Sequence, residues 1–163
     1  MVVAGKEASS RESGRVATWP YYLFAVTAGA MLPFQFGINS VLARYVEGAA
    51  RASLVSFVVG TLALLVAVLV FFRGVPSGEK LASAPWWVWV GGILGAFYVL
   101  GSVVTAPKLG AATLVALILA GQAAASLTVD HFGLVGFTEN PVTPGRLAGI
   151  ALVALGVVLV RVF

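Results

Sequence analysis

The sequence predicts an all-α membrane protein with about five transmembrane helices. Its 163 residues are 60% hydrophobic and only 10% charged, and their mean hydropathy is +1.03. A soluble domain is about 45–50% apolar and about 25% charged, so a water-soluble globule is excluded. Because a helix needs roughly 20 apolar residues to cross a bilayer, a chain of this length holds about five spans joined by short connections.

Residues 1–20 are predicted to form a polar, flexible amino-terminal tail, and residues 21–163 a five-helix transmembrane domain. The tail mixes basic and acidic side chains with several serines, so it cannot bury enough apolar surface to fold alone. It lacks the apolar core and the small-residue cleavage site of a signal peptide. We therefore expect the tail to remain on the protein.

Five apolar stretches follow the tail, and their charges fall almost wholly at the ends, as expected of membrane-spanning helices. They cover about residues 21–46, 50–72, 85–105, 110–134 and 146–162. The connections at 73–84 and 135–144 have the proline, glycine, serine and charged residues of loops, and tight turns are expected at 47–49 and 106–109. Aromatic residues that suit the headgroup level open the first and third spans: Trp19, Tyr21, Tyr22, Trp86, Trp87 and Trp89.

The basic residues give no clear orientation in the membrane. Five spans place the termini on opposite sides, so six basic residues, three of them in the tail, oppose four. Without the tail the count is three against four, and the positive-inside rule gives no firm result. Such a chain can insert both ways and pair as two inverted copies; a fixed orientation, with the amino terminus slightly favoured inside, is the alternative. Arg44 and Glu47, three residues apart, are expected to pair locally.

The first span contains polar and helix-perturbing residues at mid-membrane depth. Pro33 removes one helical hydrogen bond, and together with Gly29 and Gly37 it predicts a helix kink. Gln35 and Asn39 lie four residues apart and so share one helix face. Amides at this depth are tolerated only in protein or beside a wet cavity. We therefore expect both to face inward, either as hydrogen-bonding groups between helices or toward a solute.

Four further residues extend this polar set. Tyr98 and Ser102 share a face of the third span and are candidates for lining a cavity, with packing and local hydrogen bonds as the alternative. Gln122, near the middle of the fourth span, should also face protein or a cavity. Asp130 is a candidate proton or ion-pair site with an arginine near a span end as its partner, and a solvated carboxylate is the alternative.

Small residues spaced four apart recur in the last three spans, where they allow helices to approach closely. The pairs are Gly91 and Gly95, Gly92 and Ala96, Ala120 and Ala124, and Gly145 and Gly149. Packing within the chain is favoured over a specific dimer role for any single pair, because glycine and alanine are abundant in this sequence.

Several functional classes are disfavoured by composition. The absence of cysteine excludes disulfides, thiolate metal sites and cysteine nucleophiles. A single histidine without neighbouring paired carboxylates supplies neither a metal cluster nor a nucleophile with its base. We therefore expect no enzymatic activity, no cofactor and no metal. The basic residues are scattered and give no nucleic-acid footprint, so the expected surroundings are a lipid bilayer.

Several segments occur in an order that is specific as a set. They are QFGIN at 35–39, SFVVGTLALL from Ser56, GGILGAFYV from Gly91, PKLGAATLVALILAGQ ending at Gln122 and DHFG at 130–133, followed by Arg146, Gly149 and Gly156. Together they resemble the YdcZ-like family of small, roughly five-span bacterial membrane proteins in the drug/metabolite transporter superfamily. The resemblance implies a half-unit of a ten-helix inverted-repeat transporter fold, with Gln35, Asn39, Gln122 and Asp130 facing the interior of a dimer.

The sequence and the resemblance together predict a secondary transporter in the cell (inner or plasma) membrane. It would move an unidentified small organic solute as an antiparallel homodimer, or with a homologous partner chain, around a midplane cavity. Two alternatives stay open: a non-transporting structural or accessory subunit that binds membrane proteins through its small residues, and a dimeric ion channel.

Overall fold

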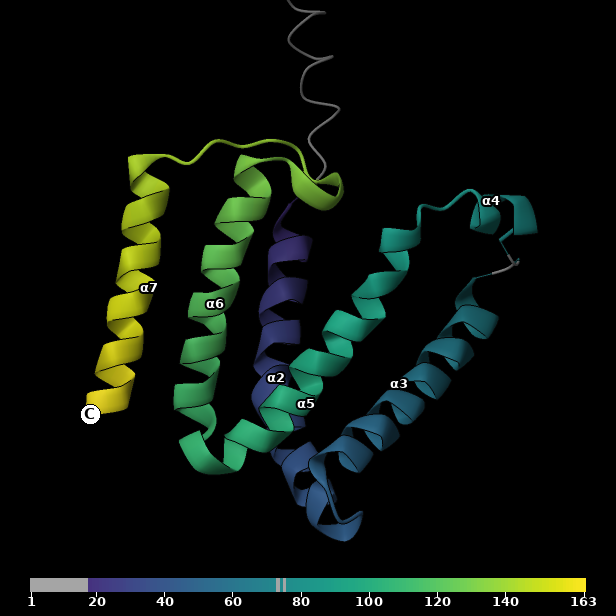
Figure 1. Ribbon diagram of the computed structural model, residues 1–163, viewed down its shortest axis with the longest axis horizontal. Coiled ribbons are helices and arrows are strands. Elements are labelled where there is room, and N and C mark those ends of the chain that lie inside the picture. Colours follow the sequence, from purple (N-terminus) through teal and green to yellow (C-terminus); the bar gives the residue numbers. More distant parts are fainter. Residues whose placement is uncertain (1–17, 73, 75) are drawn as a thin grey trace, which may run out of the picture. The chain divides into compact units, whose positions relative to one another are not determined.

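The computed structural model describes residues 18–72, 74 and 76–163, which form helices joined by turns and loops (Figure 1). The chain divides into two compact units, the first ending at Leu32 and the second covering Pro33–Phe163. Residues 1–17 of the expected tail lie outside the described residues, whereas Trp19 and Pro20 already belong to the first helix. The candidate sites described next lie in the second unit.

Within the described residues, five helices are long and apolar enough to cross a membrane, which confirms the predicted fold class. Helix α2 covers Trp19–Tyr45, α3 Ala49–Phe71, α6 Ala111–His131 and α7 Pro144–Val162. The third span combines the 3-10 helix η1 (Trp86–Val90) with α5 (Gly91–Leu109). The short helix α4 (Gly78–Ala82) lies between α3 and η1, and the 3-10 helix η2 (Leu134–Gly136) follows α6.

The turn expected at residues 106–109 is wrong, because these residues form the last turn of α5. Pro107 lies inside the helix, which ends instead at Gly110. This glycine has φ 78°, and its N–H donates to the carbonyl of Ala106 at 3.0 Å. Glycine tolerates positive φ because it has no Cβ, so Gly110 and not Pro107 ends α5. The fourth span ends at His131 rather than at residue 134, close to Gly133 with φ 58°.

The core of the second unit lies where the C-terminal part of α2 meets α3 and α5. Its buried centre consists of Ala52, Val99 and Val103. Leu42, Ala43, Val46, Ala49 and Tyr98 pack against this centre. The tight turn between α2 and α3 brings the two helices to this point, and the N–H of Gly48 donates to the carbonyl of Ala43 at 2.8 Å. Helix α6 packs against both α5 and α7.

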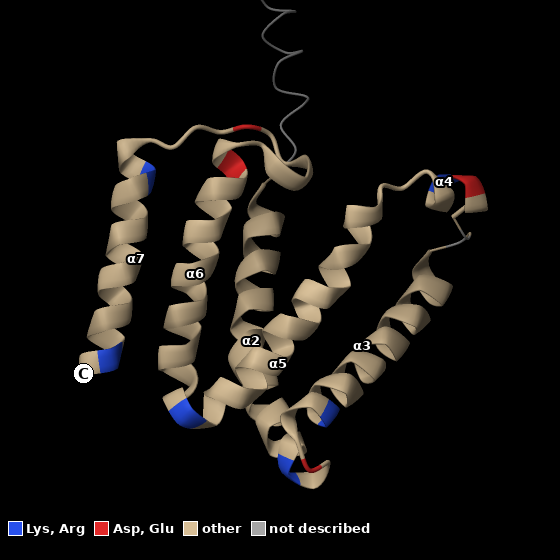
Figure 2. Ribbon diagram, in the orientation of Figure 1, with Lys and Arg blue, Asp and Glu red and all other residues tan. Residues whose placement is uncertain are grey.

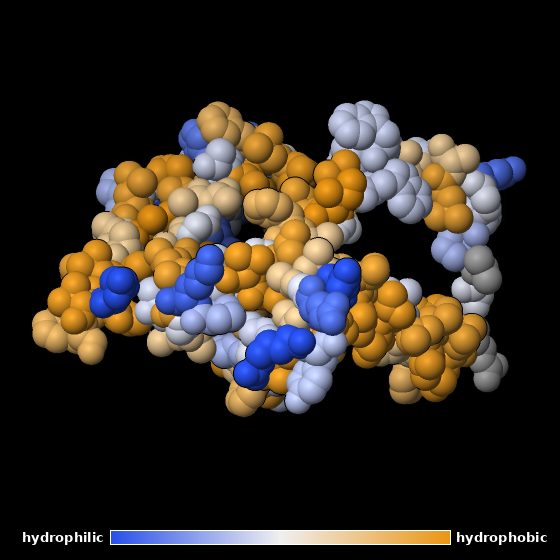
Figure 3. All heavy atoms as spheres, turned by 60° about the horizontal axis from the view of Figure 1, so that its bottom comes forward, coloured by the Kyte–Doolittle hydropathy of each residue, from blue (hydrophilic) through white to orange (hydrophobic). Residues whose placement is uncertain are grey.

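Among the described residues of the second unit, charged side chains lie at the ends of the membrane-spanning helices or in the connections, and the middle of each of these helices carries none (Figure 2). One end carries Arg44, Arg51, Lys108 and Arg161 with Glu47, and the other carries Lys80 and Arg146 with Glu79, Asp130 and Glu139. When the first of these ends is turned toward the viewer, hydrophilic side chains form separate patches within a hydrophobic surface (Figure 3). This distribution is typical of helices whose middle sections face hydrocarbon.

Candidate functional site

A small polar pocket lies among α2, α3 and α5 at mid-height of the helices. Its volume is about 200 Å³, and it is lined by Gln35, Ser56, Phe57, Gly60, Thr61, Leu64 and Val99. Gly60 is the central residue of α3, which places the pocket about 16 Å from either end of that helix at 1.5 Å per residue. Gln35, predicted to line a cavity, therefore lies half-buried at this depth beside the hydroxyl side chains of α3.

Two buried polar atoms on the same helices have no hydrogen-bond partner among the described residues. They are Nδ2 of Asn39 and the hydroxyl of Tyr98. Asn39 is only 4% exposed, and the ring of Tyr98 packs edge-to-face on Phe36 with centroids 6.0 Å apart. A buried polar group without a partner costs about 1–3 kcal/mol. Water, a solute or another chain would supply the missing partners.

The other predicted lining residues, Ser102 and Gln122, do not line the polar pocket. Ser102 is buried, but its hydroxyl donates to the carbonyl of Val99 at 2.7 Å, so its proton is used within α5. Gln122 is exposed on α6 and does not line the polar pocket. Four of the six polar candidates thus lie on α2 and α5, whereas Gln122 and Asp130 lie on α6.

Asp130, at the end of α6, forms an ion pair with Arg146 near the start of α7. The side chains of Arg146 and Asp130 are 31% and 27% exposed. Arg146 also donates from Nη1 to the carbonyl of Asn140 at 2.8 Å, and the N–H of Asn140 donates to the carbonyl of Asp130 at 2.7 Å. These contacts join the ends of two neighbouring helices through the loop between them.

The same loop is held at two further points. The N–H of Val142 donates to Nδ1 of His131 at 3.3 Å. Thr143 caps the N-terminus of α7 by accepting from the N–H of Arg146 at 3.3 Å, and Pro144 occupies the first turn, where its missing N–H leaves no bond unmade. The α6–α7 junction is therefore a structured connection.

The residues of the predicted kink fall on both sides of the unit boundary. Gly29 belongs to the first unit, whereas Pro33 and Gly37 belong to the second. Helix α2 runs continuously through Pro33. Pro33 and Gly37 line a second, larger pocket.

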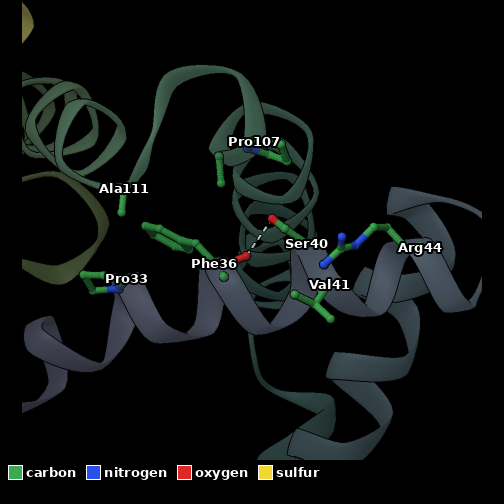
Figure 4. Close-up of a pocket in the computed structure, with 9 residues that line it drawn as sticks. Pro33, Phe36, Ser40, Val41, Arg44, Pro107 and Ala111 are labelled. Carbon is green, nitrogen blue, oxygen red and sulfur yellow. Dashed lines mark hydrogen bonds between the residues drawn. The ribbon is translucent and has the colours of Figure 1, made fainter.

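This second pocket has a volume of about 460 Å³ and lies among the C-terminal part of α2, the end of α5 and the start of α6 (Figure 4). It is lined by Pro33, Phe36, Gly37, Ser40, Val41, Arg44, Ala106, Pro107 and Ala111. The expected pairing of Arg44 with Glu47 is wrong, because Oε2 of Glu47 accepts from Nη1 of Arg51 at 3.3 Å. Helix α2 ends at Tyr45 and Glu47 has φ 56°, so the helical spacing that would join Arg44 to Glu47 is broken.

Sequence reasoning missed several residues that line these pockets. Ser56 and Thr61 flank Gly60 in α3 and were not among the candidates. Neither hydroxyl stands out in the sequence, because it can bond to a carbonyl one turn earlier on its own helix. Arg44 was missed because it was assigned to a surface ion pair.

Five membrane-spanning helices with polar groups between them at mid-height define a small multi-pass helical membrane protein. Residues 20–159 match the profile of the family described as "Putative inner membrane exporter, YdcZ". The chain is 31% identical over 141 residues to "Inner membrane protein YdcZ" of Escherichia coli (strain K12), a match that covers 84% of this chain and 91% of that protein. The chain therefore belongs to the YdcZ family, as its resemblance predicted. No solved structure matches it.

Proposed function

We propose that this protein is a secondary transporter of a small organic solute in the inner (plasma) membrane. It works as an antiparallel homodimer, or with a homologous partner chain, around a midplane cavity. The description of its family as an exporter and the name of its relative from Escherichia coli support transport in that membrane. The observation that carries the proposal is the pair of buried polar atoms between the helices, Asn39 Nδ2 and the Tyr98 hydroxyl, which are unpartnered among the described residues.

The chemistry of the polar pocket fits a solute with both donors and acceptors. Gln35 offers an amide that donates and accepts, and Ser56 and Thr61 offer hydroxyl groups. Polar groups at this depth are stable only where they are satisfied by protein or line an aqueous cavity. A water-accessible path to this pocket satisfies them and admits a solute.

The size of the pocket supports a second chain. Its volume of about 200 Å³ lies below the range of about 300–1,000 Å³ that is typical of small-molecule sites. One chain therefore offers part of a site, and an inverted second copy would enlarge it. The exposed amide of Gln122 and the open space around Gly145 and Gly149, where an added Cβ would meet no heavy atom within 4 Å, give that copy a surface to cover.

Water access to the polar pocket tests the proposal, and the cysteine-free chain allows single reporters. Thr61→Cys should react with a membrane-impermeant thiol reagent added to either face of oriented vesicles, because alternating access opens the site to both sides. Val59→Cys, on the same helix but outside the pocket and 60% exposed, is the matched control and should stay unlabelled. Complete protection of Thr61→Cys from both faces would favour the accessory-subunit alternative.

Orientation in cells tests the dimer. A reporter fused after Phe163 and a separate tag in the loop at 76–84 should each give comparable signals from both membrane faces if the chain inserts both ways. A single orientation would contradict the antiparallel homodimer and direct attention to a partner chain. Asp130 is the candidate proton-exchanging group, so Asp130→Asn should remove any pH dependence of a measured flux.

A further inference from the structure

The larger pocket combines an apolar lining with one cationic side chain. The side chains of Pro33, Val41 and Pro107 supply apolar surface to this lining (Figure 4). The guanidinium of Arg44 extends back along α2 toward Ser40 and Val41, and so toward the pocket (Figure 4). Long helical side chains point toward the N-terminus of their helix, which explains why an arginine in the last turn of α2 reaches inward.

One polar group of the pocket, the guanidinium of Arg44, is available to donate hydrogen bonds to an anion. Ser40 Oγ donates to the carbonyl of Phe36 at 2.7 Å, so its proton is already used. Arg44 forms no ion pair within 4.0 Å with any carboxylate of the described residues, because Glu47 pairs with Arg51. The guanidinium of Arg44 is therefore the group available to a ligand, and its planar fork matches the two oxygens of a carboxylate or sulfonate.

The surrounding charge also favours an anion. The helix ends on the same side of the second unit as this pocket carry four cations (Arg44, Arg51, Lys108 and Arg161) and one acid (Glu47), a sum of +3. The described residues at the opposite ends carry two cations (Lys80 and Arg146) and three acids (Glu79, Asp130 and Glu139), a sum of −1. A positive field at the end that contains Arg44 raises the local concentration of anions.

We propose that this pocket binds an amphipathic organic anion, with its carboxylate or sulfonate on Arg44 and its apolar body against Pro33, Val41 and Pro107. The volume of about 460 Å³ lies within the range for drug-sized ligands, and a two-chain phospholipid would place only part of itself there. The occupant is therefore a free solute with one aryl or acyl group. Binding at this pocket does not require transport, so it stands apart from the function proposed above.

Photolabelling of the full-length protein in phosphatidylcholine nanodiscs tests this site. The probe is a diazirine-bearing benzoate, and the matched controls are the corresponding neutral benzamide and cationic benzylammonium. The benzoate should label residues of the C-terminal part of α2 and the α5–α6 turn, with an apparent affinity about tenfold above that of the amide. Equal labelling by the three probes, or adducts elsewhere in the chain, would overturn the proposal.

Substitutions assign the binding to the pocket. Arg44→Gln should weaken benzoate binding about tenfold, and Val41→Trp should reduce it by filling the pocket while the cation is kept. Arg51→Gln, at the same membrane face but outside the pocket, is the matched control for lost charge and should weaken benzoate binding far less than Arg44→Gln. Unchanged binding in Val41→Trp would contradict the site even if Arg44→Gln failed to fold.

Lipid composition separates the free solute from a lipid headgroup. Nanodiscs that contain phosphatidylglycerol should leave benzoate labelling within about twofold of that in phosphatidylcholine if the pocket selects a small organic anion. Complete displacement by phosphatidylglycerol would overturn the assignment in favour of a lipid site. Failure of these assays with normal labelling of Thr61→Cys would reject the anion site and leave the proposed transport function standing.

Discussion

The ion pair between Asp130 and Arg146 should contribute about 1–3 kcal/mol to the stability of the α6–α7 junction. Its side chains are 27% and 31% exposed, between fully exposed pairs, which contribute about 0.2–1 kcal/mol, and buried pairs, whose disruption costs about 3–5 kcal/mol. Arg146 additionally donates to the carbonyl of Asn140 at 2.8 Å. Arg146→Gln should therefore cost about 2–3 kcal/mol, and Asp130→Asn about 1–2 kcal/mol, because Arg146 keeps its contact with Asn140.

A double-mutant cycle measures this coupling. The free energy of unfolding would be obtained by titrating detergent-solubilised protein with dodecyl sulfate and following tryptophan fluorescence. The double variant Asp130→Asn/Arg146→Gln should lose at least about 1 kcal/mol less than the sum of the two single variants. Arg161→Gln, on the same helix and without an ion pair among the described residues, should change stability by less than about 0.5 kcal/mol. Simple additivity would refute the assigned interaction.

Three further substitutions test the connections and the surface charges. Gly110→Ala should destabilise the protein by about 1–3 kcal/mol in the same titration, because φ 78° with ψ 160° is accessible almost only to glycine; an unchanged midpoint would contradict the assigned backbone. Val135→Gly should raise stability by about 1 kcal/mol by relieving a β-branched residue at φ 50°, and lower stability would speak against that strain. Arg51→Gln should change the unfolding free energy by less than about 1 kcal/mol, because its pair with Glu47 is exposed. A larger loss would contradict this exposure and would indicate that a second chain buries the pair.

Hydropathy predicted the spans of this protein well, and local backbone geometry set their ends. The number of membrane-spanning helices follows from apolar runs long enough to cross a bilayer. The end of α5 was placed too early, because a tight turn was expected at residues 106–109, whereas the helix continues through Pro107 to Leu109. Gly110, one residue after the helix, is the terminator.

The residues of the polar site could be predicted only in part from the sequence. Gln35 and Asn39 stand out because a side-chain amide within an apolar helix needs partners beyond that helix. Ser56 and Thr61 do not stand out, since serine and threonine hydroxyls can bond to a carbonyl one turn earlier on their own helix. The partner of Asp130 could only be narrowed to the arginines near span ends, because the loop between α6 and α7 decides which of them it meets.

The small number of buried side chains has a consequence for how this sequence can diverge. Among the described residues, only Phe36, Ala52, Val99, Val103, Leu114, Asn39, Ser53 and Ser102 are buried. A buried residue is constrained in volume and shape by its neighbours, whereas a residue facing lipid must only be apolar. Most positions of the spans are exposed in this chain, and those that face lipid accept substitutions among aliphatic residues with little effect on folding. An identity of 31% over most of the chain is what so small a set of buried positions allows between members of one family.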